Sequence, residues 1–159
     1  MACVMRIRPA MLDDVTAVAT MMVEFETHLA AIEGKKKSFA MQGFAKALRK
    51  AMAHQPPLAH VLMAEEGRKP LGYVLYCPAF NASRRKPVIY VQDLFVRRAV
   101  RAKGTGRKLM LEMRKIARKL GCGSIAWTVW NRNPRALAFY LGLGAEPIED
   151  EIMLEWKVK

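Results

Sequence analysis

The segment from Leu94 to Leu109 has the composition of a phosphate-binding turn at the start of a helix. An apolar run ends at Val96, and a basic loop then leads into Gly104-Thr105-Gly106. Glycine lets a ligand approach the backbone closely, and the unpaired amides at a helix N-terminus attract an anion. Cationic side chains that could add to this attraction are Arg101, Lys103, Arg107 and Lys108. The turn therefore suits a pyrophosphate, although the same glycines could equally relieve strain in an ordinary turn.

Two common nucleotide-binding patterns do not fit this turn. A Walker loop needs Gly-x-x-x-x-Gly-Lys-Ser/Thr, and a dinucleotide fingerprint needs a third glycine. A second notable segment lies about thirty residues further on. It reads Trp130-Asn-Arg-Asn-Pro-Arg-Ala-Leu-Ala-Phe-Tyr140 and is followed by Leu143-Gly-Ala.

Together the two segments resemble the GNAT superfamily of N-acetyltransferases. Arg101-x-x-Gly104-x-Gly106 matches the family's acyl-CoA pyrophosphate loop, Arg/Gln-x-x-Gly-x-Gly/Ala. Residues 133–140 match its Asn-x-x-Ala-x-x-Phe-Tyr segment, and Gly144-Ala145 matches the pair that begins its last hairpin. The opening residues 6–14 also resemble the family's first strand and turn, so the resemblance covers nearly the whole chain.

The resemblance implies acetyl-CoA as co-substrate and assigns the residues that hold it. In the family the pantetheine arm pairs with the motif strand like an added strand, a form of β-augmentation. The implied cofactor-binding residues are Leu94, Phe95, Val96, Arg101, Ala102, Lys103, Gly104, Thr105, Gly106, Arg107 and Asn133. Tyr140 matches the usual general acid, which protonates the departing thiolate. Taken alone, Tyr140 is better explained as a packing aromatic, and the full motif is what favours the acid role.

The strand segment 89–96 most resembles the diamine and polyamine acetyltransferase branch. That branch reads Tyr-x-Glu-Asp-Leu/Phe-Phe-Val, and this chain has Gln92 in place of the glutamate. An amide cannot accept a proton from an ammonium, so Asp93 is the predicted base, acting directly or through a water. Asp93 could equally anchor a bend of the strand. Gln92 remains a predicted substrate contact.

The first helix lines the acceptor pocket in this family, which implies substrate-binding side chains on it. Glu24 and His28 are four residues apart and therefore share a helical face. Both are predicted to contact the amine, with Glu26 nearby on the same helix. For any single one of them, a solvated helix face is the alternative.

The order of apolar segments predicts an α/β fold with a mixed sheet, in one domain over residues 1–159. The family resemblance implies that this sheet is GNAT-like and mostly antiparallel. Strands are expected at 4–8, 59–64, 71–77, 88–96, 125–130 and 152–158. Helices are expected behind Asp13-Asp14 and at 39–53, 104–120 and 134–141. With the family resemblance, we expect six or seven strands flanked by about four helices.

The composition limits the class of protein. The chain has 159 residues, 52% of them hydrophobic and 26% charged, and a net charge of +13. Three cysteines far apart, Cys3, Cys77 and Cys122, argue against a disulfide framework or a zinc site. We found no run of about 18 apolar residues and no secretory signal, and expect a cytoplasmic protein without a metal or a membrane segment.

Three functions fit the sequence. The first is transfer of an acetyl group to a primary amine of a small molecule, by direct attack in a ternary complex, with a homodimer possible. The charge of +13 shifts the expected substrate from a polyamine toward an amino acid, a lysine-like thioether amine or an amine with an anionic group. The second is a nucleic-acid- or ribosome-binding protein on the same fold, which the basic residues 107–119 and 35–37 suggest but no stacking aromatics support. The third is a protein acetyltransferase.

Overall fold

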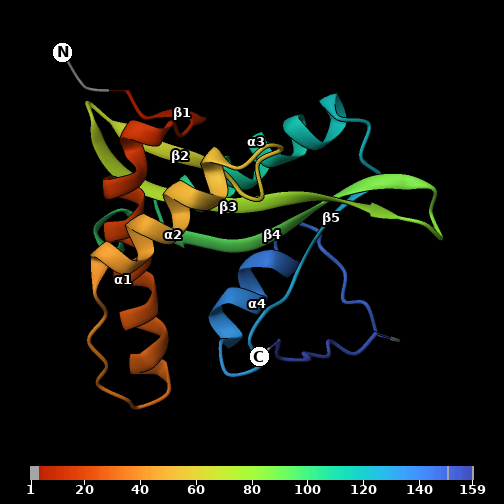
Figure 1. Cartoon of the computed structure of the whole chain (residues 1–159). Helices are drawn as coiled ribbons and strands as arrows, with labels where there is room; N and C mark the ends of the chain where they lie inside the picture. Colours follow the sequence, from red (N-terminus) through yellow and green to blue (C-terminus); the bar gives the residue numbers. More distant parts are fainter. Residues whose placement is uncertain (1–3, 150, 159) are drawn as a thin grey trace. The chain divides into compact units, whose positions relative to one another are not determined.

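The computed structural model describes residues 4–149 and 151–158 (Figure 1). The chain divides into two compact units, and the boundary in the sequence lies between Thr128 and Val129. The first unit contains the sheet and three of the helices, and the second contains the last helix and the C-terminal segment.

The sheet of the first unit is mixed and mostly antiparallel, as predicted. Its strands lie in chain order, each of the first four antiparallel to the next, and the last pair is parallel. They are β1 (Arg6–Pro9), β2 (His60–Glu66), β3 (Lys69–Asn81), β4 (Lys86–Val96) and β5 (Ser124–Trp127). Over the described residues the sheet has 5 strands and not six or seven.

Helices cover both faces of this sheet (Figure 1). A short 3₁₀ turn, η1 (Leu12–Asp14), leads into α1 (Val15–Ile32), which is followed by α2 (Met41–Ala53). These two helices pack on one face, where Val18, Met21 and Tyr73 are buried together. On the other face lies α3 (Thr105–Lys119), which buries Leu109 and Met113 against the sheet.

The segment Leu12–Ile32 is long and apolar enough to cross a membrane by length and composition alone, contrary to the expectation from the sequence. In the structure it behaves as a core helix. Val15, Val18 and Met21 recur at three-residue intervals and are fully buried against the sheet. Packing therefore explains the apolar residues on this face of the helix.

A bulge in β4 sets the direction of its side chains. Leu75 of β3 lies opposite Asp93, but the next residue, Tyr76, lies opposite Val91, so Gln92 is the extra residue. Alternation along a strand would put Val91 and Asp93 on the same face. Because Gln92 is an extra residue, the two side chains instead lie on opposite faces of the sheet. Val91 packs on the α3 side, and Asp93 lies opposite Leu75 on the α1 side.

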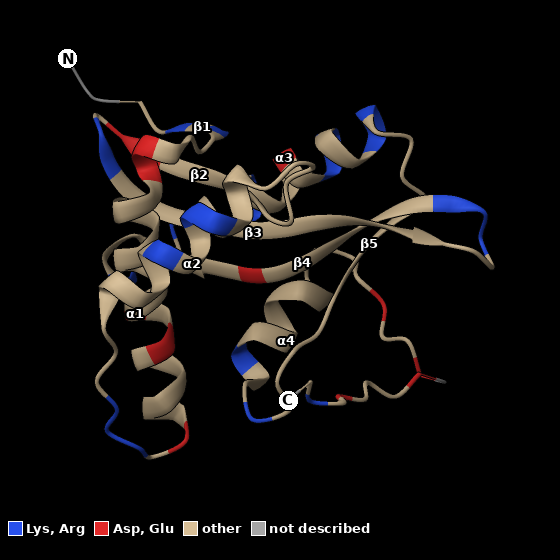
Figure 2. Ribbon diagram, viewed as in Figure 1, with Lys and Arg blue, Asp and Glu red and all other residues tan. Residues whose placement is uncertain are grey.

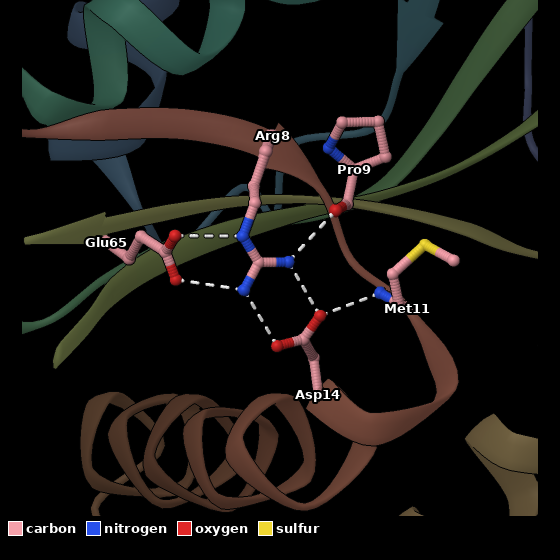
Figure 3. A network of polar contacts seen from close by, with 5 residues as sticks. All are labelled: Arg8, Pro9, Met11, Asp14 and Glu65. Atoms are coloured by element: carbon pink, nitrogen blue, oxygen red, sulfur yellow. Dashed lines mark hydrogen bonds and ion pairs between the residues drawn. The ribbon is translucent and has the colours of Figure 1, made fainter. Parts of the chain in front are cut away.

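An ion-pair network fixes β1 to its neighbours (Figure 3). The Arg8 guanidinium donates to both oxygens of Asp14, at 2.7 and 2.9 Å, and to both oxygens of Glu65, at 2.8 and 2.9 Å. Asp14 also accepts from the backbone N–H of Met11. Arg8 lowers the pKa of both carboxyls below their ordinary values, chiefly through these hydrogen bonds.

The second unit contains α4 (Pro134–Leu141), with the boundaries predicted from the sequence. Asn133 caps this helix, because its Oδ1 accepts from the N–H of Ala136 at 3.1 Å, and proline is well suited to the first helical position.

The predicted strand at 152–158 does not form. Residues 151–158 have no regular secondary structure, and Trp156 is 96% exposed. Alternating apolar residues can form a strand only where a sheet edge accepts their backbone hydrogen bonds. The sequence pattern alone could not show whether such an edge would be available.

Candidate active site

The turn between β4 and α3 presents backbone amides at a helix N-terminus. After β4 the chain forms a 3₁₀ turn, η2 (Arg98–Val100), and reaches Gly104, which precedes α3 with a φ of +81°. Glycine adopts this left-handed conformation without strain, and a Cβ built there would meet nothing within 4 Å. Because glycine has no side-chain oxygen to cap the helix, the first amides of α3 are left for a ligand.

The same turn has a second residue with positive φ. Ala102 has a φ of 63°, which is uncommon for a residue with a Cβ. Alternation of left- and right-handed conformations turns successive N–H groups toward one side and forms an anion-binding concavity. Lys103 and Arg107 are exposed beside it. The predicted residues 102–107 are therefore brought together in one turn, which carries exposed cations and in which Thr105 is buried.

Arg101 differs from its cationic neighbours in the turn. Its Nε donates to the carbonyl of Val96 at 2.8 Å, and its guanidinium carbon lies 5.7 Å from the centre of the Phe95 ring. A terminal nitrogen lies 3.4 Å from Nε2 of His28. The side chain thus folds back over the end of β4, where it holds the loop in position.

The last part of β4 has an open edge on the β5 side within the first unit. Strand β5 pairs with β4 only from Val88 to Val91, whereas β3 pairs with it as far as Val96. Residues 92–96 therefore leave backbone groups on that side without a sheet partner among the described residues of this unit. The predicted contacts Leu94, Phe95 and Val96 lie on this stretch, and it leads directly into the glycine turn.

Asp93 is a half-buried carboxylate beside this edge. Oδ2 lies 3.4 Å from the hydroxyl of Tyr73, which is fully buried and donates to it. Burial raises the pKa of Asp93 to about 6, the Tyr73 hydrogen bond opposes this rise, and the charge of Glu26 adds to it. Burial also raises the pKa of Tyr73, so this phenol stays protonated. Asp93 is thus ionised at neutral pH but close to its titration range.

Glu24 and His28 share a face of α1, as predicted, and both contact the loop that follows β4. The guanidinium of Arg97 donates to Glu24 at 2.7 to 3.1 Å and to the carbonyl of Pro70 at 2.9 Å. His28 lies next to Arg101. These contacts join α1 to the start of the glycine turn and occupy the Glu24 carboxylate. Gln92, the bulged residue, is exposed.

The other two predicted residues belong to the second unit. Asn133 uses its side-chain oxygen to cap α4, so only its amide nitrogen could donate to a ligand. Tyr140 lies near the end of the same helix, is half-buried, and packs edge-on against Phe139 with ring centres 5.1 Å apart.

No group of three or more metal-ligating side chains occurs among the residues that the structure describes. Cys77 and Cys122 are free thiols, and Cys3 lies outside the described residues.

A profile of the acetyltransferase (GNAT) family matches residues 21–145, which include most of α1, the bulged strand, the glycine turn and α4. The chain belongs to this family. Among acetyltransferases of known activity, it is 34% identical over 87 residues to the L-ornithine N5-acetyltransferase of Arabidopsis thaliana, a match that covers 55% of this chain and 36% of that enzyme. It is 28% identical over 113 residues to the thialysine N-epsilon-acetyltransferase of Bos taurus, covering 66% of each chain.

A solved structure has a similar fold. An integron cassette protein from the mobile metagenome of V. cholerae superposes with a TM-score of 0.84 at 26% identity, over 97% of this chain and 93% of that one.

Two residues of the site could not be found from the sequence, and the role of a third was not evident from it. Tyr73 and Arg97 were not singled out, and Glu26 was noted only for its place on the first helix. Arg97 and Glu24, which are in contact, are separated by 73 positions in the sequence. Tyr73 and Asp93 are separated by 20 positions. No local pattern predicts such pairs.

Proposed function

We propose that this protein is an acetyl-CoA-dependent N-acetyltransferase whose acceptor is a small molecule with two amino groups. The observation that carries the proposal is the position of Asp93 at the start of the open edge of β4, which leads into the glycine turn. The segment from Asp93 to Gly104 thus combines three features in order: a carboxylate with a pKa of about 6, an open strand edge and an anion-binding turn.

The residues of the turn fit the diphosphate of acetyl-CoA. The amides that follow Gly104 have no capping side chain, the space beside its Cα is open, and exposed cations surround it. The backbone of Leu94, Phe95 and Val96 can pair with the pantetheine arm as an added strand. Acetyl-CoA supplies the activated acetyl group, and Asn133 is assigned an additional contact with its arm.

Transfer requires an uncharged amine, a polarised carbonyl and a proton for the leaving thiolate. Asp93 accepts one proton from the substrate ammonium, which leaves a lone pair for attack. The backbone amide near Leu94 donates to the oxygen that becomes negative, a contribution typically of about 10²-fold or more. Tyr140 is assigned the donation of a proton to the sulfur, so that the C–S bond breaks as the C–N bond forms. The nitrogen then loses a second proton to give the amide, and this proton restores the Tyr140 phenol.

Glu26 supports an acceptor with a second positive charge. Glu26 lies on α1, which packs on the face of the sheet where Asp93 lies opposite Leu75, and its charge raises the pKa of Asp93. Two neighbouring carboxylates favour a dication, even on a protein with a net charge of +13, because nearby charges dominate the local field. Ornithine and thialysine, the substrates named for two relatives, each carry two amino groups.

A ligand-binding experiment and an activity screen test the proposal. Acetyl-CoA at 100 times its dissociation constant should stabilise the fold by about 2.7 kcal/mol, read as a higher Tm. Thiol release should then be fastest with ornithine, thialysine or a diamine, and slow with monoamines. An unchanged Tm at millimolar acetyl-CoA, or equal rates with every amine, would contradict the proposal.

Two matched variants separate the roles of the acidic residues on α1. Glu26→Gln should raise KM for the diamine and leave the dissociation constant of acetyl-CoA unchanged. Glu24→Gln should mainly weaken acetyl-CoA binding, because it removes the ion pair with Arg97 that holds the loop. If Glu24→Gln changes only the KM of the amine, Glu24 contacts the substrate as the sequence first suggested.

A further inference from the structure

The basic surface of the first unit continues well beyond the acetyl-CoA turn. Helix α3 carries Arg107 and Lys108 near its start and Arg114, Lys115, Arg118 and Lys119 further along, all exposed. Its one acidic residue, Glu112, is paired with Lys115 at 2.8 Å. Between residues 67 and 145 the sequence has only one other acidic residue, Asp93, which is half-buried in the site.

The far end of α3 lies beside the tip of the β3–β4 hairpin. The backbone N–H of Gly123, just after the helix, donates to the carbonyl of Pro87 at 2.9 Å. The side chain of Lys86 packs on Gly123 so closely that a Cβ there would lie 3.1 Å from its Cδ. Figure 2 shows the cations of the helix end and of the hairpin at the same end of the unit.

The hairpin extends past the sheet as an arm. Strand β3 pairs with β2 only up to Tyr76 but continues to Asn81 opposite Lys86. The arm carries three consecutive exposed cations, Arg84, Arg85 and Lys86. Phe80, on the same arm, is 67% exposed.

These charges exceed what acetyl-CoA requires. At 1.5 Å per residue, Arg118 lies about 16 Å along the helix from Arg107, and the arm lies beyond it. A diphosphate bound at the N-terminus of α3, as in the proposed function, would therefore leave the far cations unused. A surface of spread cations with an exposed aromatic side chain fits a strand of phosphates with unpaired bases, since cations bind the backbone and an aromatic ring stacks on a base.

We propose that the far end of α3 and the β3–β4 arm form a binding surface for single-stranded nucleic acid, distinct from the acetyltransferase site. Arg118, Arg84, Arg85 and Lys86 bind the phosphates, and Phe80 stacks on a base. This surface is independent of the proposed substrate.

Fluorescence anisotropy with a labelled 20-nucleotide single strand of RNA or DNA tests this surface. Binding should be measurable at 150 mM salt and should weaken steeply with added salt. The triple variant R84Q/K86Q/R118Q should bind at least tenfold more weakly and reduce the salt slope by about 2, as expected for three lost phosphate contacts. A duplex of the same sequence should bind more weakly than the single strand.

A matched control changes the same charge elsewhere. K35Q/K36Q/K37Q removes three exposed cations from the loop after α1 and should change affinity by less than about threefold. An equal loss of affinity for the single strand in both triple variants would show that binding depends on net charge alone, and it would overturn the proposal. Displacement of the strand by acetyl-CoA would also overturn it, because it would place the nucleic acid in the glycine turn.

Two further readings complete the test. Binding to phosphatidylserine vesicles without binding to nucleic acid would overturn the proposal in favour of a membrane surface. The Tm increase with acetyl-CoA should persist in R84Q/K86Q/R118Q, which shows that the variant is folded. Because the strand binds without acetyl-CoA or amine, failure of the enzymatic proposal would not affect this measurement.

Discussion

Replacement of Asp93 by asparagine should make the protein more stable and less active, and the size of the first effect can be worked out from its burial. Burial raises the pKa of Asp93 from an ordinary value of 3.8 to about 6. A carboxyl group with a raised folded pKa ionises more readily in the unfolded chain, so stability is lost as the pH rises from about 4 to about 6. Above that range the fold bears the full cost of the buried charge.

The cost at pH 8 is at most about 3 kcal/mol, because one pKa unit corresponds to about 1.4 kcal/mol. Asparagine has nearly the same shape and carries no charge, but it accepts a weaker hydrogen bond from Tyr73. We therefore expect Asp93→Asn to stabilise the fold by about 1–3 kcal/mol at pH 8, which raises Tm by about 2–10 °C in a chain of this size. At pH 4 and below the difference should nearly vanish.

The same change should remove the base. In the unmodified enzyme kcat/KM should increase with pH through about 6 as Asp93 ionises. In Asp93→Asn the increase of kcat/KM around pH 6 should be absent, and kcat/KM at neutral pH should be lower by about 10²-fold or more. Thiol release and Tm, both measured from pH 4 to 9, test the two expectations on the same samples.

Glu112→Gln is the matched control, since it also removes one carboxylate, but on the outer face of α3 beside Lys115. Its stability should change by less than about 1 kcal/mol at every pH. Equal destabilisation by Asp93→Asn at pH 4 and pH 8 would contradict the cost assigned to the buried charge. A kcat/KM of this variant that still increases with pH around 6 would show that Asp93 is not the base.

Three further predictions concern the turn, the proposed acid and the network at β1. Gly104→Ala should weaken acetyl-CoA binding about five- to tenfold, because a side chain disfavours the φ of +81° by about 1 kcal/mol or more and projects into the space beside the amides. An unchanged affinity for acetyl-CoA in a calorimetric titration would place the ligand elsewhere. Tyr140→Phe should lower kcat at least tenfold with little change in acetyl-CoA binding, and full activity would mean that another group protonates the sulfur. Arg8→Met should lower the free energy of unfolding by about 2 kcal/mol at pH 7, because two half-buried carboxylates lose their partner. Since Arg8 lowers their pKa values, the network stabilises above about pH 5 and is lost as the pH falls, so urea titrations at pH 3 should show a smaller difference.

The sequence by itself determined the local structures, because their causes lie within a few residues. Helix α4 begins where Asn133 can cap it and Pro134 can follow, and these residues predicted its start. The glycine turn was recognisable because only glycine adopts its conformation at position 104 without strain. The three- and four-residue spacing of apolar side chains likewise predicted α1 and α3.

Tertiary structure decided the number of strands and the chemical state of the site. The apolar alternation at 152–158 resembles a strand, but residues 151–158 find no sheet partner. The bulge at Gln92 exists only in the pairing of β4 with β3, and it turns Asp93 toward Tyr73. Likewise, the sequence predicted only that Glu24 shares a helical face with His28 and contacts the amine, and its ion pair with Arg97 is seen only in the fold. Burial, pKa and pairing depend on groups far apart in the chain, so no local pattern contains them.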